Sequence, residues 1–362
     1  MQDDVQDFDP DLAELPKRGW RGKVAASSEA EGVFRPLGKR HFAAHVERGD
    51  TLIVTFETIQ GIRALSESAE PLGWSMVRDN GWSSLCVVSE GDTWVRDRNV
   101  FGLFDNLIDD GFFDGFGTIL FYGAGPCGYA ATAYSVAAPG ARVFAIQPQA
   151  TLDPRVTEWD DRFVEMRRTD FTARYGYAPD MLDACAQAFV LYDPAETLDA
   201  MHAALFTRTG VTKLRMRHMG DAIQSDLMQM DALLPLLKQA ANGTLTEAAF
   251  ATAYRDRRTH RPYLRRLMAA LDARGRDELV EMLARYVTER MKAPRFQRRL
   301  AESEARCNAV KARFEEHSYL WRTDLDAFFA DFLRDAVVTT PLGQELWDLD
   351  KFEAAIVQYK AA

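Results

Sequence analysis

Short apolar runs recur along the middle of this chain, and segments with apolar residues at three- and four-residue spacing separate several of them. The runs cover residues 52–56, 84–88, 118–122, 142–146, 188–192 and 212–216. Most of them lack polar alternation, which is typical of strands whose two faces are both covered by helices. The pattern predicts a mostly parallel α/β sheet flanked by helices, with crossover helices over 100–111, 127–138 and 197–206.

After Gly220 the pattern changes to helical periodicity with almost no strand character. The helical segments cover residues 226–241, 246–256, 263–274, 277–291, 296–314 and 323–336. Apolar residues three and four positions apart form one face of a helix. We therefore expect a partly disordered lead-in over 1–50, an α/β core over 51–220 with an inserted cap over about 153–187, and an all-helical region over 221–362.

The length and composition are those of a globular protein. The chain has 362 residues, of which 47% are hydrophobic, so it can bury a sizeable core. No run approaches the roughly 18 apolar residues that a membrane span requires. The first residues are acidic, whereas a signal peptide is basic and then apolar. These features predict a cytoplasmic protein.

Charge and cysteine content narrow the classes of partner. The net charge of −10 disfavours nucleic acid as the main partner. Basic residues outnumber acidic ones only between about 255 and 313, where we expect a solvated helix face with internal ion pairs. The four cysteines, which are Cys86, Cys127, Cys185 and Cys307, contain no C-x-x-C pair, so neither a disulfide framework nor a metal site is predicted. A small molecule or a protein remains as partner, with possible homo-oligomerisation through the helical region.

The turn Gly123-Ala-Gly-Pro-Cys-Gly128 lies between a predicted strand and a predicted helix. As G-x-G-x-x-G, its glycines Gly123, Gly125 and Gly128 would let a pyrophosphate approach the N-terminus of the helix. Such a site would belong to an oxidoreductase that uses FAD or NAD. The next strand, however, ends in Gln147-Pro-Gln149 instead of the acidic residue that holds the ribose. This interpretation is kept as an alternative.

The same turn also matches the G-x-S-x-G pattern of a nucleophile elbow, with Gly125 at the serine position. Asp193 and His218 follow later predicted strands, in the Ser, Asp, His order of α/β-hydrolases. Residues 118–131 and 147–154 resemble α/β-hydrolase-like bacterial proteins, some of them tied to surface polysaccharides or secretion. In those proteins the turn reads Gly-x-Ser-Met-Gly-Gly-Tyr-Ala-Ala. The resemblance implies an α/β-hydrolase-like fold with a degraded nucleophile turn.

Without the serine, three chemical outcomes remain open for this turn. In the first outcome, which we favour, the pocket serves binding alone, with no cofactor, and the chain is a pseudo-hydrolase. Cys127 could act as a displaced nucleophile, because the N-terminal dipole of a helix stabilises a thiolate. Asp193 and His218 could activate water directly. Whether the chain is an enzyme is open at this point.

Residues 121–131, 147–161 and 203–207 also resemble a group of alphaproteobacterial chains often labelled phosphoadenosine phosphosulfate reductase. That resemblance implies sulfonucleotide reduction by a cysteine nucleophile, with thioredoxin as electron donor. The chain lacks the Ser-Gly-Gly-x-Asp-Ser loop and the Glu-Cys-Gly-x-His motif shared by such reductases. Its last cysteine is Cys307, flanked by Arg306 and Asn308. Sulfonucleotide reduction is therefore a minor alternative.

Overall fold

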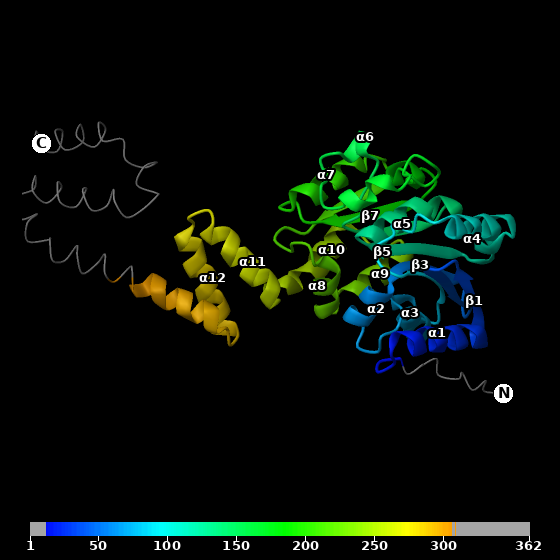
Figure 1. Ribbon diagram of the computed structural model, residues 1–362. Helices are drawn as coiled ribbons and strands as arrows, with labels where there is room; N and C mark the ends of the chain where they lie inside the picture. Colours follow the sequence, from blue (N-terminus) through cyan, green and yellow to red (C-terminus); the bar gives the residue numbers. More distant parts are fainter. Residues whose placement is uncertain (1–11, 306–307, 309–362) are drawn as a thin grey trace, which may run out of the picture. The chain divides into compact units, whose positions relative to one another are not determined.

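An eight-stranded sheet forms the centre of the first compact unit, Met1–Tyr263, of the computed structural model, which describes residues 12–305 and 308 (Figure 1). The strands lie in the order β1-β2-β4-β3-β5-β6-β7-β8. Their bounds are β1 (Gly32–Leu37), β2 (His41–Val46), β3 (Thr51–Thr58), β4 (Ser83–Ser89), β5 (Thr118–Ala124), β6 (Arg142–Ile146), β7 (Gln187–Tyr192) and β8 (Val211–Arg215). Strands β3 to β8 are parallel, whereas β2 runs antiparallel to both β1 and β4. The predicted mostly parallel sheet is confirmed.

Helices cover both faces of this sheet, which is why most of its central strands are largely apolar. One face packs on α4 (Arg98–Asp109), α5 (Pro126–Tyr134) and α7 (Thr197–Leu205). The opposite face packs on α1 (Lys17–Glu31), α2 (Ile59–Leu65), α3 (Leu72–Asn80), α8 (Ile223–Gln229), α9 (Leu233–Ala241) and α10 (Glu247–Ala253). Successive residues of a strand point to opposite faces. Phe121 accordingly packs in the first layer, and its neighbours Leu120 and Tyr122 in the second.

The segment expected to be a partly disordered lead-in is ordered from residue 17 onward. It forms α1, β1 and β2, and Trp20 and Val24 of α1 are fully buried. Trp20 packs against Phe42 of β2, with ring centroids 6.2 Å apart. The expectation was wrong here because α1 is polar except for one narrow stripe, and a stripe that short is a weak periodic signal. Residues 1–11 lie outside the described part of the chain.

The boundary between core and helical region lies later than predicted. Helices α8, α9 and α10 pack on the sheet through buried side chains that include Leu227, Leu236 and Phe250. The chain divides into two compact units after Tyr263, not after residue 220. Helical periodicity reveals which face of a helix is apolar, but not which part of the protein that face packs on. The sequence therefore predicted these helices and misassigned their domain.

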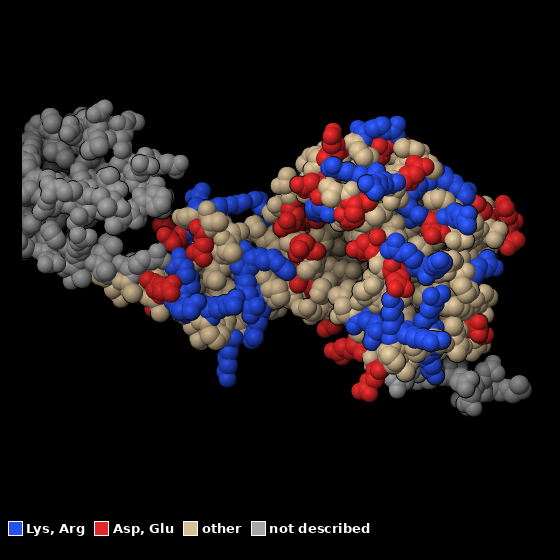
Figure 2. Space-filling model, viewed as in Figure 1, with Lys and Arg blue, Asp and Glu red and all other residues tan. Residues whose placement is uncertain are grey.

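The second unit is helical where the structure describes it, as predicted. It contains most of α11 (Arg261–Asp272), α12 (Asp277–Arg290) and helical residues 294–305. Basic side chains are prominent on this unit, with acidic ones among them (Figure 2). Arg299 pairs with Asp272 and Asp277 at 3.0 and 2.9 Å. Internal ion pairs of the expected kind are therefore present, while the predicted helix 323–336 and Cys307 lie outside the described residues.

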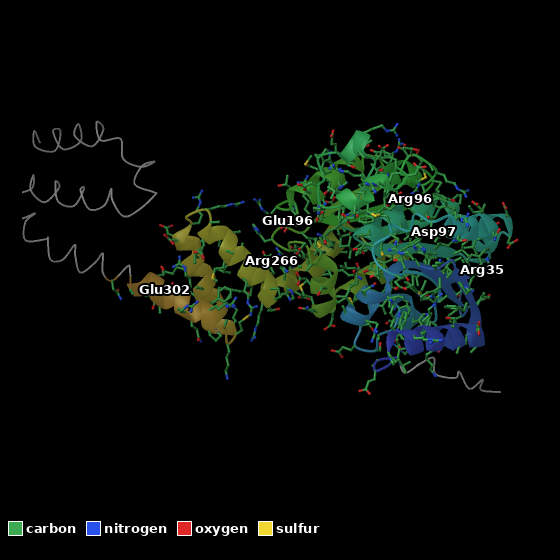
Figure 3. The ribbon with its side chains drawn as sticks, in the orientation of Figure 1. Arg35, Arg96, Asp97, Glu196, Arg266 and Glu302 are labelled. Atoms are coloured by element: carbon green, nitrogen blue, oxygen red, sulfur yellow. The ribbon has the colours of Figure 1, made fainter. Side chains whose placement is uncertain are left out.

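The segment expected to form a helical cap, 153–187, is more irregular than predicted. It contains α6 (Pro154–Thr157) and two 3-10 helices, Val164–Arg168 and Ala178–Leu182. Asp153, Asp160 and Asp170 each accept a hydrogen bond from the backbone N–H two residues later, which turns the chain. Arg96 (labelled in Figure 3) ties the segment down by donating to the carbonyl oxygens of Asp170 and Arg174.

Within the described residues, none of the helices combines the length and the apolar character needed to cross a membrane.

Candidate ligand-binding site at the β5–α5 turn

A cavity of about 550 Å³ lies at the carboxyl ends of β3 and β5. These two strands are neighbours, but the chain leaves β3 toward β4 on one side and leaves β5 toward β6 on the other. Open α/β sheets bind ligands where the strand order reverses in this way. The residues that line the cavity at the strand ends are Phe56, Glu57 and Thr58 from β3, and Ala124, Pro126 and Cys127 from the β5–α5 turn. Helices α2, α8 and α9 contribute most of the remaining wall.

Gly125 is the apex of the β5–α5 turn and has a backbone conformation that favours glycine. Its φ is +56° and its ψ is −124°. Its N–H donates to the carbonyl oxygen of Ile146 at 2.8 Å, and its own carbonyl accepts from the N–H of Tyr129. A Cβ at this position would meet no heavy atom within 4 Å. The apex therefore faces open space and carries no side chain.

Gly123 and Gly128 are required by close packing. A Cβ at position 123 would lie 2.1 Å from the carbonyl oxygen of Cys127, and one at position 128 would lie 2.9 Å from that of Ile146. Both glycines let α5 pack closely on the strand ends. Because the Gly125 N–H bonds to Ile146, it is not available to a pyrophosphate. The geometry gives the FAD or NAD alternative no support beyond the motif itself.

Gln147 lies at the position where a dinucleotide site needs an acidic residue. Its side chain forms hydrogen bonds to other residues of the protein. Its side-chain amide donates to Asp199 at 2.7 Å and to the carbonyl oxygen of Gly220 at 3.3 Å. Asp199 also accepts from Arg162 at 2.7 Å. Gln147, Asp199 and Arg162 line a second depression, of about 350 Å³, which shares Ala124 and Pro126 with the main cavity. Since their polar groups bond to one another, they connect the segment after β6 with α7.

Cys127 lies in the first turn of α5 and lines the main cavity, yet its side chain is buried. Burial raises the pKa of its thiol, and the nearby carboxyl groups of Glu57 and Asp92 raise it further. The helix dipole acts in the opposite direction but is worth only about 1 kcal/mol. The thiol form is therefore strongly favoured, and the geometry does not support Cys127 as a nucleophile.

Asp193 follows β7 directly, as predicted, but its carboxylate is engaged by backbone groups. One oxygen accepts from the N–H of Ala195 at 2.8 Å, and the other accepts from the N–H of Gly220 at 2.7 Å. The side chain is 1% exposed. Asp193 thus joins the segments that follow β7 and β8, which is a structural role.

His218 follows β8 but lines a different depression from Cys127. That depression is formed by β8 together with residues of α10 and its surroundings, such as Phe250 and Tyr254. Neither Cys127 nor Asp193 is among its lining residues. The three residues predicted as catalytic therefore do not share one pocket. Their order along the chain follows the order of the strands, but it does not determine where each side chain points.

Glu57 is a candidate functional residue that the sequence reasoning missed. It lies near the carboxyl end of β3, lines the cavity and is 9% exposed. Its Oε1 accepts from Thr55 Oγ1 at 2.7 Å, and the N–H of Leu72 lies 3.1 Å from each carboxyl oxygen. Burial raises its pKa to about 7, although these hydrogen bonds act in the opposite direction. A single glutamate ending an apolar run at the carboxyl edge of the sheet was the available signal.

Several other buried carboxyl groups of the described chain pair with basic side chains, whereas Asp193 accepts from backbone N–H groups. Glu70 pairs with Arg78 at 2.9 Å, Asp160 pairs with Arg162 and His202 at 2.8 Å each, and Asp226 pairs with His260 at 2.9 Å. No such pair with a basic side chain involves Glu57 in the part of the chain that the structure covers. No group of three or more potential metal ligands occurs among those residues either.

Comparison with known proteins gives similarity at the level of structure. No family model and no curated protein matches the chain. A thermostable carboxylesterase cloned from a metagenomic library is 14% identical, with 65% of this chain and 98% of that chain covered and a TM-score of 0.39. A hyperthermophilic esterase from the archaeon Pyrobaculum calidifontis is 13% identical, with 67% of this chain and 93% of that chain covered and a TM-score of 0.35. Alpha/beta hydrolase domain-containing protein 10 from mouse is 11% identical, with 59% of this chain and 98% of that chain covered and a TM-score of 0.37.

The chain has an α/β fold built on an eight-stranded, mostly parallel sheet. This architecture is the one that the apolar runs of the sequence predicted, and it includes a helical C-terminal region as far as the structure describes it. One fold can support many unrelated functions. Function has to be argued from the cavity and the residues that line it.

Proposed function

We propose that this protein is a pseudo-hydrolase that binds a small molecule at the β5–α5 turn and lacks the serine route of hydrolysis. The observation that carries the proposal is Gly125 at the apex of the turn, where the hydrolase pattern places the nucleophile. A glycine has no hydroxyl with which to attack an ester. The cavity beside it is nevertheless open at about 550 Å³.

The groups that could replace a serine triad are not placed to do so. The thiol of Cys127 has a raised pKa, the carboxylate of Asp193 accepts two backbone N–H groups, and His218 lines another depression. No histidine is among the described residues that line the cavity. Acyl transfer requires a nucleophile and a base within hydrogen-bonding reach of each other. The site therefore favours binding over hydrolysis.

The cavity has the character of a small-molecule site. Its walls include the apolar side chains of Phe56, Ile62, Leu65, Met228 and Leu233, interrupted by a few polar groups. Ligand pockets of roughly 300 to 1,000 Å³ with mainly apolar walls are typical of small-molecule sites. A role linked to surface polysaccharides or secretion, implied by the resemblance of the turn, stays a prediction until the ligand is known.

A substitution that fills the cavity tests the proposal. Met228→Trp places a larger side chain on the cavity wall, whereas Met282→Trp makes the same change at a side chain that is 66% exposed on α12. We expect saturation-transfer NMR to detect 1-hexanol bound to the wild type and to Met282→Trp, but not to Met228→Trp. Equal binding to all three proteins would show that the cavity is not the binding site.

A further inference from the structure

We propose that the cavity binds an organic ammonium ion, a protonated amine on an apolar body, with Glu57 as the acceptor of the ammonium group. This inference rests on the proposed function and names the ligand class of the same site. Three features carry it: the charge of the cavity lining, the unpaired buried carboxyl group of Glu57, and the apolar wall.

Charged side chains that line the cavity are all acidic. They are Glu57, Glu70, Asp92 and Asp231, and no Lys, Arg or His is among the lining residues that the structure describes. Asp92 and Asp231 are exposed, while Glu70 is buried and paired with Arg78. A cleft lined by charges of one sign raises the local concentration of the opposite ion. The lining therefore attracts cations and repels anions.

Glu57 provides a fixed acceptor inside this cavity. Thr55 and Leu72 hold its carboxyl group in place from within β3 and from the first residue of α3. An ionised carboxylate has about four acceptor positions, so these two donors leave capacity for a ligand. A buried charge is costly unless a counter-charge accompanies it. An ammonium group would supply the counter-charge that the protein itself does not provide to Glu57.

Binding of an ammonium ion should therefore depend on pH. Burial raises the pKa of Glu57 to about 7, so below that value an ammonium ion must displace a proton to the solvent as it binds. The neighbouring Cys86 of β4, Tyr122 of β5 and Cys127 of α5 all have raised pKa values and remain neutral near pH 7. The other charged groups of the lining are the paired Glu70 and the exposed Asp92 and Asp231. Affinity should rise about tenfold from pH 6 to pH 8 as Glu57 ionises.

The apolar wall selects for a ligand with a hydrocarbon body. Ile62 and Leu65 of α2 line the cavity together with Met228 of α8 and Leu233 and Leu234 of α9. Burial of one methylene group stabilises a complex by enough to change the affinity about fourfold. A short amine should therefore bind much more weakly than a long one, although both carry the same charge.

Calorimetric titration of the full chain with three probes of equal length tests the inference. The probes are n-hexylammonium, 1-hexanol and hexanoate, each measured at pH 6 and pH 8. We expect n-hexylammonium to bind most tightly, and Glu57→Gln to weaken that binding about tenfold or more at pH 8 while removing its pH dependence. Asp109→Asn removes a charge from the exposed end of α4, outside the cavity lining, and should leave binding unchanged.

The outcomes separate this inference from the proposed function. The ammonium proposal is wrong if all three probes bind equally or if hexanoate binds most tightly. In either case, loss of that binding in Met228→Trp would still show that the cavity is a binding site. If Glu57→Gln binds n-hexylammonium as the wild type does, the acceptor role is wrong. If no probe binds in a way that Met228→Trp abolishes, both proposals fail. Should Met228→Trp not fold, Leu65→Trp on α2 fills the same cavity.

Discussion

At the scale of the residue, Glu57 brings an ionisable group into the interior without a cation beside it. Its carboxyl group accepts hydrogen bonds from Thr55 and Leu72, yet burial still raises its pKa to about 7. The folded state therefore binds the proton of Glu57 more tightly than the unfolded state, whose carboxyl group has an ordinary pKa. The free energy of unfolding must consequently fall as the pH rises between the two values.

We predict that Glu57→Gln removes this dependence on pH. Below a pH of about 4.5 the buried carboxyl group is neutral in both states and costs nothing. As the pH rises through about 7, the wild type should lose about 3 kcal/mol relative to the variant. Urea unfolding at pH 5 and pH 8 measures the difference, with Asp109→Asn as the control for a change of net charge. A difference between wild type and Glu57→Gln that is equal at both pH values would contradict the assigned burial.

Gly125 is the second residue that decides the chemistry of the site. Restoring the serine of the hydrolase pattern by Gly125→Ser should cost about 1–2 kcal/mol, because the φ of +56° is unfavourable for a residue with a Cβ. The side chain itself has room. We predict a folded variant without esterase activity, since no described histidine lines either the main cavity or the second depression, which Gly125 lines, to activate the hydroxyl. Release of p-nitrophenolate from p-nitrophenyl acetate measures this; turnover above buffer would reveal a base that the geometry does not show.

At the scale of the element, close packing of α5 on the strand ends holds the turn in place. Gly128 of α5 approaches the carbonyl oxygen of Ile146 so closely that a Cβ would lie 2.9 Å from it. Gly102 of α4, by contrast, has no heavy atom within 4 Å of the position where a Cβ would be. Both helices cover the same face of the sheet. Close packing requires a glycine at position 128, whereas no neighbouring atom requires one at position 102.

The pair predicts opposite changes in stability. Gly128→Ala should destabilise the protein by about 1–3 kcal/mol, because α5 must move away from β6 to make room. Gly102→Ala should stabilise it by about 0.5–1 kcal/mol, because alanine favours the helix and meets no obstacle. Thermal unfolding of both variants checks this. Equal effects in the two helices would show that α5 does not pack as described.

The same scale shows what the sequence could predict about elements. Strands β3 to β7 were predicted because both of their faces are largely buried, so each reads as a mostly apolar run, whereas β8 is an edge strand with Leu214 as its buried residue. Helix α1 was missed because its three buried positions, Trp20, Val24 and Ser28, lie among exposed polar residues and one of them is itself polar. The segment 153–187 was predicted to be a helical cap, but several of its turns are made by Asp side chains. Turns in which an Asp carboxylate accepts from the backbone N–H two residues later, as Asp153 does, are hard to recognise in a long segment.

At the scale of the whole molecule, the sequence predicted the strand-turn-helix around Gly125 but not which side chains surround it. The structure places a cavity at the carboxyl ends of β3 and β5, beside that turn. Which side chains enter that pocket depends on tertiary packing. Asp193 and His218 follow the expected strands but point elsewhere, whereas Glu57 points into the cavity from a strand that had been assigned no function.

One NMR experiment tests the central claim, which is that the cavity binds without hydrolysing. Hexyl acetate is incubated with the full-length protein and with Met228→Trp, and saturation transfer and the hexanol signal are followed together. The account predicts saturation transfer to the intact ester from the wild type alone, with hexanol appearing no faster than in buffer. Accumulation of hexanol with the wild type and not with Met228→Trp would show that the site at the β5–α5 turn is a working hydrolase.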